Sequence, residues 1–266
     1  MRLAAFVTLT RRICFVGAVA CFASSPSALA ANPKPDFTFK TKVVEISLTL
    51  DDKIKADPTL AADCRAEGKK WATKQRIDAE KMYKESPESF SNRAWTFERS
   101  YSIRSVVNGR YVSIVRDEYE YTGGAHPNRG ADTILWDETV KKRISIRPFF
   151  NETADDGPTL KALRQGIINS LKVEKKKRGA EGADLNLIEG IEAKLLKIGP
   201  VSLAPSTEAG KSSGLTFHYA PYAVGSYAEG SYIAFVPWET LKPYLTPEGI
   251  AIFGGARPSG DDDGQR

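Results

Sequence analysis

YTGGAHPN, residues 121–128, ends a long β-prone run and holds two adjacent glycines, a proline and one of the chain's two histidines. Gly123 and Gly124 indicate backbone angles or close approaches that a Cβ atom would forbid. Pro127 fixes its own φ angle and drives His126 toward an extended conformation. The sequence therefore predicts a sharply shaped loop here rather than a flexible linker.

The first thirty residues are typical of a secretory signal peptide. Three arginines precede an apolar run from Ile13 to Ala23, and Ala28-Leu29-Ala30 fits a small-residue cleavage site. The run is about half of the ~20 residues that a membrane-spanning helix needs, so we expect no transmembrane helix after signal cleavage. Lipoprotein anchoring at Cys21 is the alternative. The mature chain is therefore expected to be exported, either periplasmic or secreted.

The mature chain is nearly neutral and carries one cysteine. The 266-residue chain has a formal net charge of +5, and loss of the three leader arginines leaves +2. Such a balance does not favour a nucleic-acid partner. Two of the three cysteines leave with the leader, so Cys64 cannot form an internal disulfide and no Cys-x-x-Cys metal cluster exists. We interpret Cys64 as a buried small apolar residue rather than as a nucleophile.

The N-terminal part predicts a strand followed by a long helix. Residues 36–50 alternate, with apolar side chains at Val44, Ile46 and Leu48, which indicates a half-buried strand. Residues 59–84 contain no proline and repeat apolar side chains, including Met82, at helical spacing. We expect this segment to form an amphipathic helix that lies over a sheet.

A meander of antiparallel strands is expected next. Runs of β-prone residues at 94–107 and 111–121 flank Asn108-Gly109. This dipeptide favours a hairpin because a type I′ turn needs positive φ at both central positions. Segments 132–136 and 143–146 predict a second hairpin.

The following segment indicates two helices. The first contains Leu160, Leu163, Ile167 and Leu171 and ends in the basic run 175–178, whose charges complement the helix dipole. The second is expected to run from Ile188 to Ile198 and to end at Gly199-Pro200.

The last third returns to β-structure. Alternating residues at 215–219 and 232–236 predict two strands, and a loop of sequence PYAVGSYAEG, residues 221–230, separates them. A short helix is expected to start at Pro237. The segment from residue 254 to 266 is rich in glycine, proline and acids, which predicts a disordered tail.

The two loops YTGGAHPN and PYAVGSYAEG, in this order and separated by two helices, resemble a pair of bacterial domains of unknown function. Those domains form the extracellular part of lysozyme-sensing anti-sigma factors. They also occur as the accessory region of polysaccharide deacetylases that act on peptidoglycan. The resemblance spans residues 36–245. Around the second loop it rests on Phe217, Pro221, Tyr222, Val224, Gly225, Tyr227, Ala228, Gly230, Pro237 and Leu241.

The chain also departs from both groups of proteins. An anti-sigma factor needs a cytoplasmic segment and a membrane helix, whereas twelve residues precede the apolar run here and no other hydrophobic span follows. The deacetylase relatives carry a separate catalytic domain with an Asp and His metal set. This chain has no room for that domain and has two histidines. The resemblance therefore implies a stand-alone sensor or accessory module.

No catalytic motif is present in the sequence. His126 and His218 lack the H-x-x-x-H and H-E-x-x-H spacings of zinc sites, and Gly225-Ser226 lacks the G-x-S-x-G spacing of serine hydrolases. His218 is expected to face solvent because its parity is opposite to that of Phe217 and Tyr219. We predict no metal, no cofactor and no enzymatic activity.

A carboxylate pair for glycoside cleavage stays open, because any two acids can converge in a fold. The acids nearest to the two loops are Asp117, Glu118, Glu120 and Glu229. Glu118 and Glu120 share one strand face, which is typical of a solvated surface.

His126 has three interpretations. Its imidazole can satisfy buried backbone groups of a tight loop, contact a ligand, or bind a metal. Tyr222 and Tyr227 can pack between the loops, stack on sugar rings, or anchor a protein partner. The candidate ligand-binding residues are Tyr121, Gly123, Gly124, His126, Asn128, Tyr222 and Tyr227.

Three functions follow from these observations. The first is an exported, non-catalytic envelope binding module for lysozyme or peptidoglycan fragments. A charge of +2 offers no electrostatic steering toward lysozyme, which is typically basic. The alternative is a peptidoglycan or sugar-ester hydrolase that uses acids near the glycine loop. The third is a structural envelope protein whose loops serve folding alone.

The expected fold is α+β. A mainly antiparallel sheet carries the long N-terminal helix, and a second α/β unit contains two helices. The corresponding division is a signal peptide at 1–30, an N-terminal domain at 31–128, a C-terminal α/β domain at 129–253 and a tail at 254–266. The sequence leaves open the oligomeric state and whether the two halves are separate domains.

Overall fold

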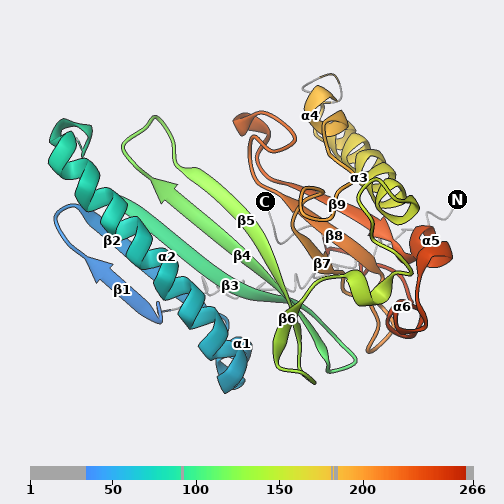
Figure 1. The fold of residues 1–266 in the computed structure, drawn as a ribbon. Helices are drawn as coiled ribbons and strands as arrows, with labels where there is room; N and C mark the ends of the chain where they lie inside the picture. The colour runs from blue at the N-terminus through green and yellow to red at the C-terminus, as the bar shows by residue number, and fades with distance from the viewer. Residues whose placement is uncertain (1–33, 91–92, 181, 183–184, 262–266) are drawn as a thin grey trace, which may run out of the picture. The chain divides into compact units, whose positions relative to one another are not determined.

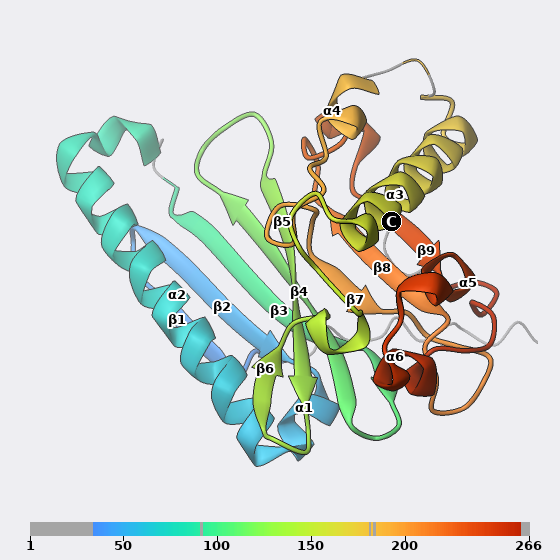
Figure 2. The same cartoon turned by 45° about the vertical axis from the view of Figure 1, so that its right-hand side comes forward.

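Two β-sheets, each covered by a long helix, make up the α+β fold that the sequence predicts (Figures 1 and 2). The structure is a computed structural model that describes residues 34–90, 93–180, 182 and 185–261. The signal peptide expected at residues 1–30 lies outside these residues and stays a prediction. Among the described residues, no helix combines the length and apolar character needed to cross a membrane.

The first sheet has six strands in the order β1-β2-β3-β4-β5-β6. All neighbours are antiparallel except β2 and β3, which are parallel. A parallel pair needs a crossover connection, and α2 supplies it. The bounds are β1 Phe37–Lys40, β2 Val44–Leu50, α1 Asp52–Ala56, α2 Pro58–Glu85, β3 Trp95–Val107, β4 Tyr111–Tyr121, β5 Asn128–Asp137 and β6 Lys142–Ile144.

The strand expected at 36–50 is two strands rather than one. The side chain of Thr41 accepts hydrogen bonds from the backbone N–H groups of Val43 and Val44 at 3.1 Å. These bonds favour a turn, so β1 folds back and pairs with β2. The alternating burial predicted for β2 is confirmed.

Helix α2 confirms the predicted amphipathic segment. Asp57 caps it by accepting from the N–H groups of Thr59 and Leu60, and Pro58 occupies the first turn. Cys64 is buried on the sheet-facing side, as expected. Met82 was predicted on that side but is 38% exposed, because α2 extends past the sheet at its C-terminal end (Figure 1).

The Asn108-Gly109 hairpin is confirmed, with φ angles of 51° and 62°. The hairpin of β5 and β6 is also confirmed, and it turns through Lys141 at a φ of 53°.

The second sheet has three strands in the order β7-β8-β9, and α3 covers one face of it (Figure 2). The predicted apolar stripe of α3 is buried. The bounds are α3 Pro158–Lys177, α4 Leu185–Glu189, β7 Val201–Leu203, β8 Gly214–Tyr219, β9 Tyr232–Pro237, α5 Trp238–Leu241 and α6 Pro247–Ile252. Short 3-10 turns lie at Pro87–Phe90, Arg147–Phe149, Tyr227–Glu229 and Lys242–Tyr244.

The second predicted helix is shorter than expected. Helix α4 ends at Glu189, where Gly190 follows, and glycine is a poor helix former. The Arg164 side chain of α3 donates to the carbonyl groups of Glu189 and Ile191 and holds this end. Ile191 and Ile198 are buried as predicted, although neither is helical.

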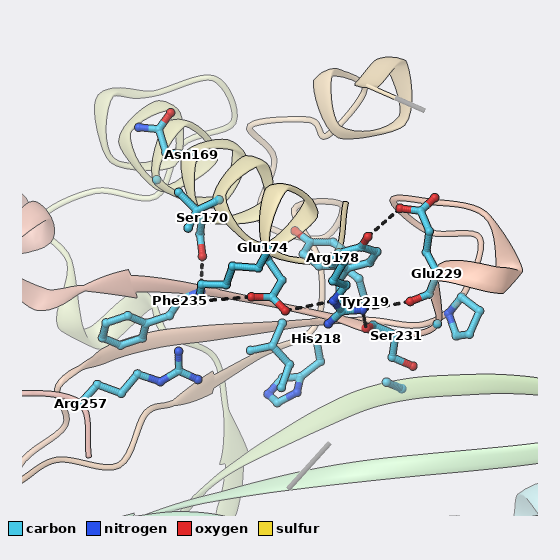
Figure 3. A pocket seen from close by; sticks show the side chains of 18 of the residues that line it. Asn169, Ser170, Glu174, Arg178, His218, Tyr219, Glu229, Ser231, Phe235 and Arg257 are labelled. Carbon is cyan, nitrogen blue, oxygen red and sulfur yellow. Dashed lines mark hydrogen bonds and ion pairs between the residues drawn. The ribbon is translucent and has the colours of Figure 1, made fainter. Parts of the chain in front are cut away.

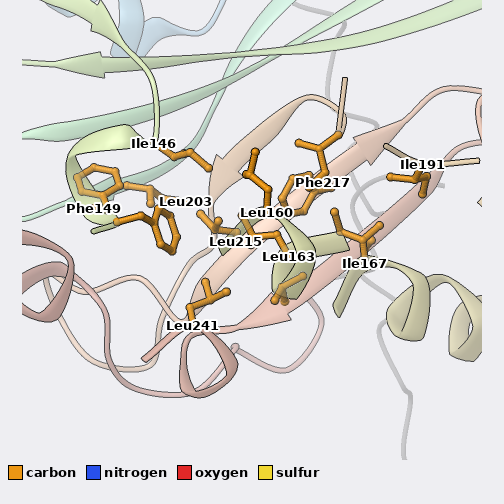
Figure 4. Close-up of a cluster of buried hydrophobic side chains, with 14 of the residues drawn as sticks. Ile146, Phe149, Leu160, Leu163, Ile167, Ile191, Leu203, Leu215, Phe217 and Leu241 are labelled. Atoms are coloured by element: carbon orange, nitrogen blue, oxygen red, sulfur yellow. The ribbon is translucent and has the colours of Figure 1, made fainter. Parts of the chain in front are cut away.

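One hydrophobic cluster joins the two sheets. It contains Val107, Tyr111 and Leu135 of the first sheet together with Leu203 and Phe217 of the second. Figure 4 labels Leu203 and Phe217 within this cluster. The boundary expected between residues 128 and 129 stays a prediction; β4 and β5 form a hairpin around the YTGGAHPN loop and so lie on either side of it. The first sheet continues to Ile144, and all described residues fall in one compact unit.

The tail expected to be disordered from residue 254 is held in place up to Asp261. Both carboxylate oxygens of Asp261 accept from Arg104 of β3 at 2.5 Å, and Arg257 adds a bond at 2.6 Å. The acidic composition predicted disorder, but charge-assisted hydrogen bonds from Arg104 and Arg257 to Asp261 order this segment.

Candidate functional site

The YTGGAHPN and PYAVGSYAEG loops contact each other through three aromatic side chains. The His126 ring stacks on Tyr227, with ring centroids 3.8 Å apart and planes at 20°. The Tyr222 hydroxyl lies 3.3 Å from His126 Nε2, and the Tyr227 hydroxyl donates to the carbonyl of Pro127 at 2.6 Å. We call His126, Tyr222 and Tyr227 the aromatic cluster.

His126 is exposed and does not satisfy buried backbone groups. Its Nδ1 lies 3.1 Å from the carbonyl oxygen of Pro127, and its other nitrogen faces Tyr222. One ring nitrogen therefore faces a backbone carbonyl of its own loop and the other faces the second loop, so His126 joins the two loops.

The other four predicted site residues lie within or beside the first loop, outside the aromatic cluster. Gly123 has a φ of +88°, and a Cβ atom there would lie 2.9 Å from the Ser89 carbonyl oxygen. Gly124 has no such requirement. Tyr121 ends β4 beneath the Arg93 guanidinium at 4.7 Å, and Asn128 begins β5 opposite Glu120.

Tyr222 adopts a left-handed backbone conformation, with a φ of 72°, and its side chain is 57% exposed. This conformation costs a non-glycine residue roughly 1–2 kcal/mol. The neighbouring Val224 is buried and anchors the loop two residues after the exposed ring. The fold thus holds Tyr222 toward solvent at an energetic cost.

A buried ion pair anchors the PYAVGSYAEG loop to α3. Lys175 Nζ lies 2.6 Å from Glu229 Oε2, and the Lys175 side chain is 0% exposed. The Tyr232 hydroxyl donates to the same oxygen at 2.6 Å, and Ser226 N–H donates to Oε1 at 2.8 Å. Burial raises the pKa of Glu229, but these hydrogen bonds outweigh it and lower the pKa to about 2.

The basic run 175–178 therefore does more than complement the helix dipole. Arg178 donates to the carbonyl oxygens of Glu229 and Ser231 at 2.9 and 2.8 Å. With Lys175, it fixes the end of the loop to the helix. Hydrophobic periodicity could not reveal this role, since Glu229 and Ser231 are distant from Arg178 in the sequence.

A groove of about 1470 Å³ runs beside the aromatic cluster. Its lining comes from β4, β5, α3, β8 and β9 and from the PYAVGSYAEG loop (Figure 3). Half-buried Ile233 and Phe235 of β9 supply apolar surface, and Tyr227 contributes to it from the aromatic cluster. Asn169 and Ser170 of α3 add polar groups. We call this feature the central groove.

Asp117 and Arg129 lie on one face of the first sheet in the central groove. Asp117 pairs with Ala131 and Tyr119 pairs with Arg129, so the two charges are diagonal neighbours. No ion pair within 4 Å joins Asp117 or Arg129 to any described residue. The guanidinium of Arg129 instead lies 5.5 Å from the ring centroid of Tyr119.

The Asp117 side chain is exposed in the central groove and is also partly desolvated by the protein around it. The surrounding protein displaces water and raises the pKa of its carboxyl, and the charge of Arg129 opposes this only in part. Sequence reasoning named Asp117 among four acids but could not distinguish it from the others.

The four acids do not form a common site. Glu118 Oε1 accepts from Arg99 at 2.6 Å and Glu229 is bound to Lys175. Side chains alternate along β4, so Glu118 and Glu120 face the side opposite to Asp117. Burial raises the pKa of Glu120, and the charge of Glu118 adds to this.

His218 does not face solvent as expected. It is 2% exposed, and its Nε2 lies 2.9 Å from Ser202 Oγ. Alternation predicted an exposed face, but β8 is buried on both faces because α3 covers one and the first sheet the other. Within the described ranges, no group of three or more His, Cys, Asp and Glu side chains has metal-binding geometry.

Residues 37–129 match the family model described as deacetylase PdaC. The match ends just after the YTGGAHPN loop and covers less than half of the chain. It supports a PdaC-type domain and the resemblance to deacetylase accessory regions. The resemblance to anti-sigma factors stays a prediction. No curated protein matches the chain.

Two solved structures are similar to this chain, and the first of them shares its fold. A DUF3298 family protein from Pseudomonas aeruginosa PAO1 is 17% identical, with a TM-score of 0.51 over 79% of this chain and 87% of that chain. A DUF3298 family member from Bacteroides fragilis NCTC 9343 is 18% identical, with a TM-score of 0.49 over 78% and 86%. At these identities the likeness concerns the fold alone.

Proposed function

We propose that this chain is a non-catalytic binding module of the bacterial envelope that holds a peptidoglycan fragment in the central groove. The groove carries this proposal. Its volume of about 1470 Å³ exceeds the roughly 300–1,000 Å³ of most small-molecule pockets. Such a groove suits an extended ligand, and a disaccharide with a peptide stem has that form.

The aromatic cluster suits the sugar part of such a ligand. Tyr222 is exposed, and the left-handed backbone that presents it has an energetic cost. Exposed tyrosines offer a flat apolar face and a polar hydroxyl, which sugar rings can contact together. Tyr227 connects this cluster to the groove, since it belongs to both.

The non-catalytic part of the proposal is supported by the positions of the acids. Glu229 and Glu118 are held in ion pairs, and Asp117 lies on the opposite strand face from Glu120. General acid–base catalysis by two carboxylates needs both groups near one bond of the substrate. Export is supported by the leader-like residues 1–30, and the PdaC match supports an accessory role beside peptidoglycan chemistry.

Calorimetry with the chain lacking residues 1–30 tests this function. The titrants are a disaccharide tripeptide from peptidoglycan and, separately, lysozyme. We expect heat with the disaccharide tripeptide at a Kd between about 1 μM and 1 mM. Absence of binding of the disaccharide tripeptide near millimolar concentration would refute the proposal. Binding of lysozyme without binding of the disaccharide tripeptide would favour lysozyme as the partner.

The hydrolase alternative has its own test. The protein is incubated with purified sacculi, and soluble sugars, peptides and released acetate are measured. We expect no product above the level of a sample without protein. Steady release of any of these products would overturn the non-catalytic assignment. Loss of that release in Asp117→Asn would identify Asp117 as the acid required for it.

A further inference from the structure

We infer that the central groove binds a zwitterionic amino-acid end of its ligand, with the ligand ammonium at Asp117 and the ligand carboxylate at Arg129. This inference rests on the proposed function and names the part of a peptide stem that is recognised. A diamino acid whose free end carries both groups on one carbon has this chemistry.

The charged residues of the groove lining provide the first argument. Nearly all of them are already paired within the protein. The pairs are Glu118 with Arg99, Glu174 with Arg178 and Lys177, Glu229 with Lys175, and Arg257 with Asp261. His218 is buried against Ser202. Among the described lining residues, Asp117 and Arg129 alone have no such ion pair, so they are left to a ligand.

Geometry provides the second argument. Diagonal neighbours on one face of an antiparallel pair have Cβ atoms roughly 7 Å apart. The Asp117 carboxylate and the Arg129 guanidinium are not within 4 Å of each other, so a ligand ammonium and carboxylate on one carbon can each make a charge-assisted bond of about 2.8 Å to one of them. Arg129 lies against the Tyr119 ring, which orients its guanidinium, and a guanidinium binds carboxylate through two parallel bonds.

The surroundings of the pair leave room for the ligand. Ala131 lies opposite Asp117 on β5, and its methyl group is too small to fill the space above Asp117. On β9, half-buried Ile233 and Phe235 present apolar surface to the same groove. An aliphatic spacer between the zwitterionic end and the rest of the stem would find contacts there.

The protonation of Asp117 gives a pH signature. Desolvation by the surrounding protein raises the pKa of the Asp117 carboxyl in the free protein, and an ammonium ligand favours the ionised form and lowers this pKa again. Affinity is therefore expected to fall as pH drops through the raised pKa of Asp117. The other charged side chains of the lining are engaged in the ion pairs given above; they are Glu118, Glu174, Lys177, Arg178, Glu229 and Arg257.

The test uses matched ligands on the wild-type protein. Calorimetry compares a free stem tripeptide that ends in meso-diaminopimelate with three relatives. One ends in lysine, which has the ammonium without the carboxylate. Another carries an acetylated side-chain amine, and the third is free diaminopimelate. We expect the unmodified tripeptide to bind roughly tenfold to hundredfold tighter than the lysine and acetylated forms.

Two variants assign the preferences to residues. Arg129→Gln should abolish the preference for diaminopimelate over lysine, and Asp117→Asn should abolish the preference for the free amine over the acetylated form. Both side chains are exposed, so we expect folded proteins, which thermal unfolding checks. Lys176→Gln, an exposed charge change on α3 outside the groove, is the control.

The outcomes separate the inference from the proposed function. Equal affinity for all three tripeptides would overturn the inference and leave the binding module in place. Failure of every peptidoglycan ligand to bind would overturn both. Tight binding of free diaminopimelate, equal to that of the tripeptide, would support the zwitterion site and refute peptidoglycan as its source.

Discussion

Replacing Glu229 by glutamine is expected to weaken the attachment of the PYAVGSYAEG loop to α3. The carboxylate accepts from Lys175 Nζ at 2.6 Å, from the Tyr232 hydroxyl at 2.6 Å and from Ser226 N–H at 2.8 Å. The Lys175 side chain is 0% exposed, so the substitution leaves a buried ammonium without its counter-charge.

Two routes give the magnitude. Removing one partner of a buried ion pair costs roughly 3–5 kcal/mol. Independently, burial raises the pKa of Glu229, but its hydrogen bonds outweigh this and lower the pKa from 4.5 to about 2. That lowering corresponds to about 3 kcal/mol of folding free energy at neutral pH. For a domain of this size, a loss of roughly 3–5 kcal/mol lowers Tm by roughly 6–20 °C.

The sign of the pH dependence follows from the lowered pKa. The contribution of the Glu229 carboxylate to stability is complete above its unfolded-state pKa near 4.5 and is lost as the pH falls toward about 2. The difference in unfolding free energy between wild type and Glu229→Gln should therefore be largest at neutral pH and shrink below a pH of about 4.

Urea unfolding followed by circular dichroism measures both effects. Lys176→Met removes an exposed charge from the same helix and should cost less than about 0.5 kcal/mol. Lys175→Met combined with Glu229→Gln should recover much of the loss, because no unpaired buried charge remains. A loss below about 1 kcal/mol in the single variant, or a difference that persists unchanged in acid, would refute this reasoning.

Three further predictions concern the loops and the cysteine. Gly123→Ala should lower the free energy of unfolding in urea by roughly 1–2 kcal/mol, because the φ of Gly123 is +88° and a Cβ atom there would clash with the Ser89 carbonyl oxygen. Gly124→Ala, the control, should lower it by less than about 0.5 kcal/mol. Equal losses in the two variants would contradict the assigned geometry. Tyr222→Asn should change stability by less than about 1 kcal/mol, since asparagine tolerates the left-handed conformation, yet weaken binding of the disaccharide tripeptide in calorimetry at least about fivefold; unchanged affinity would exclude the ring from the site. Cys64 is buried with its pKa raised to about 12 by burial, so a thiol reagent should modify it at neutral pH only after unfolding in guanidinium, and rapid labelling of the native protein would argue against this packing.

Local signals explain the parts of the fold that sequence predicted. Asn108-Gly109 determines its turn through its own φ angles, and the apolar period of α3 determines which face it buries. The two site loops were found because their glycines, tyrosines and His126 form recognisable motifs. These features need no knowledge of distant residues.

Other features depend on partners far away in the chain. His218 alternates like an exposed residue, but the first sheet covers that face of β8. Asp261 looks disordered by composition until Arg104 is placed beside it. Glu118 has an ion pair and Asp117 has none, because Arg99 lies on the Glu118 side of β4. Sequence periodicity carries no information on such long-range pairing.

The parallel pairing of β2 with β3 imposes an order on folding. Its register joins Val44 to Trp95, so the pairing closes a connection that contains all of α2. Such distant contacts form slowly because the entropy of closure is lost before they stabilise the chain. The β3–β4 hairpin, in contrast, closes through the three residues between Val107 and Tyr111, on a timescale of about 1–10 μs. We therefore expect the hairpin to form early and to expose the free edge of β3, until α2 brings β2 onto it in the slow step.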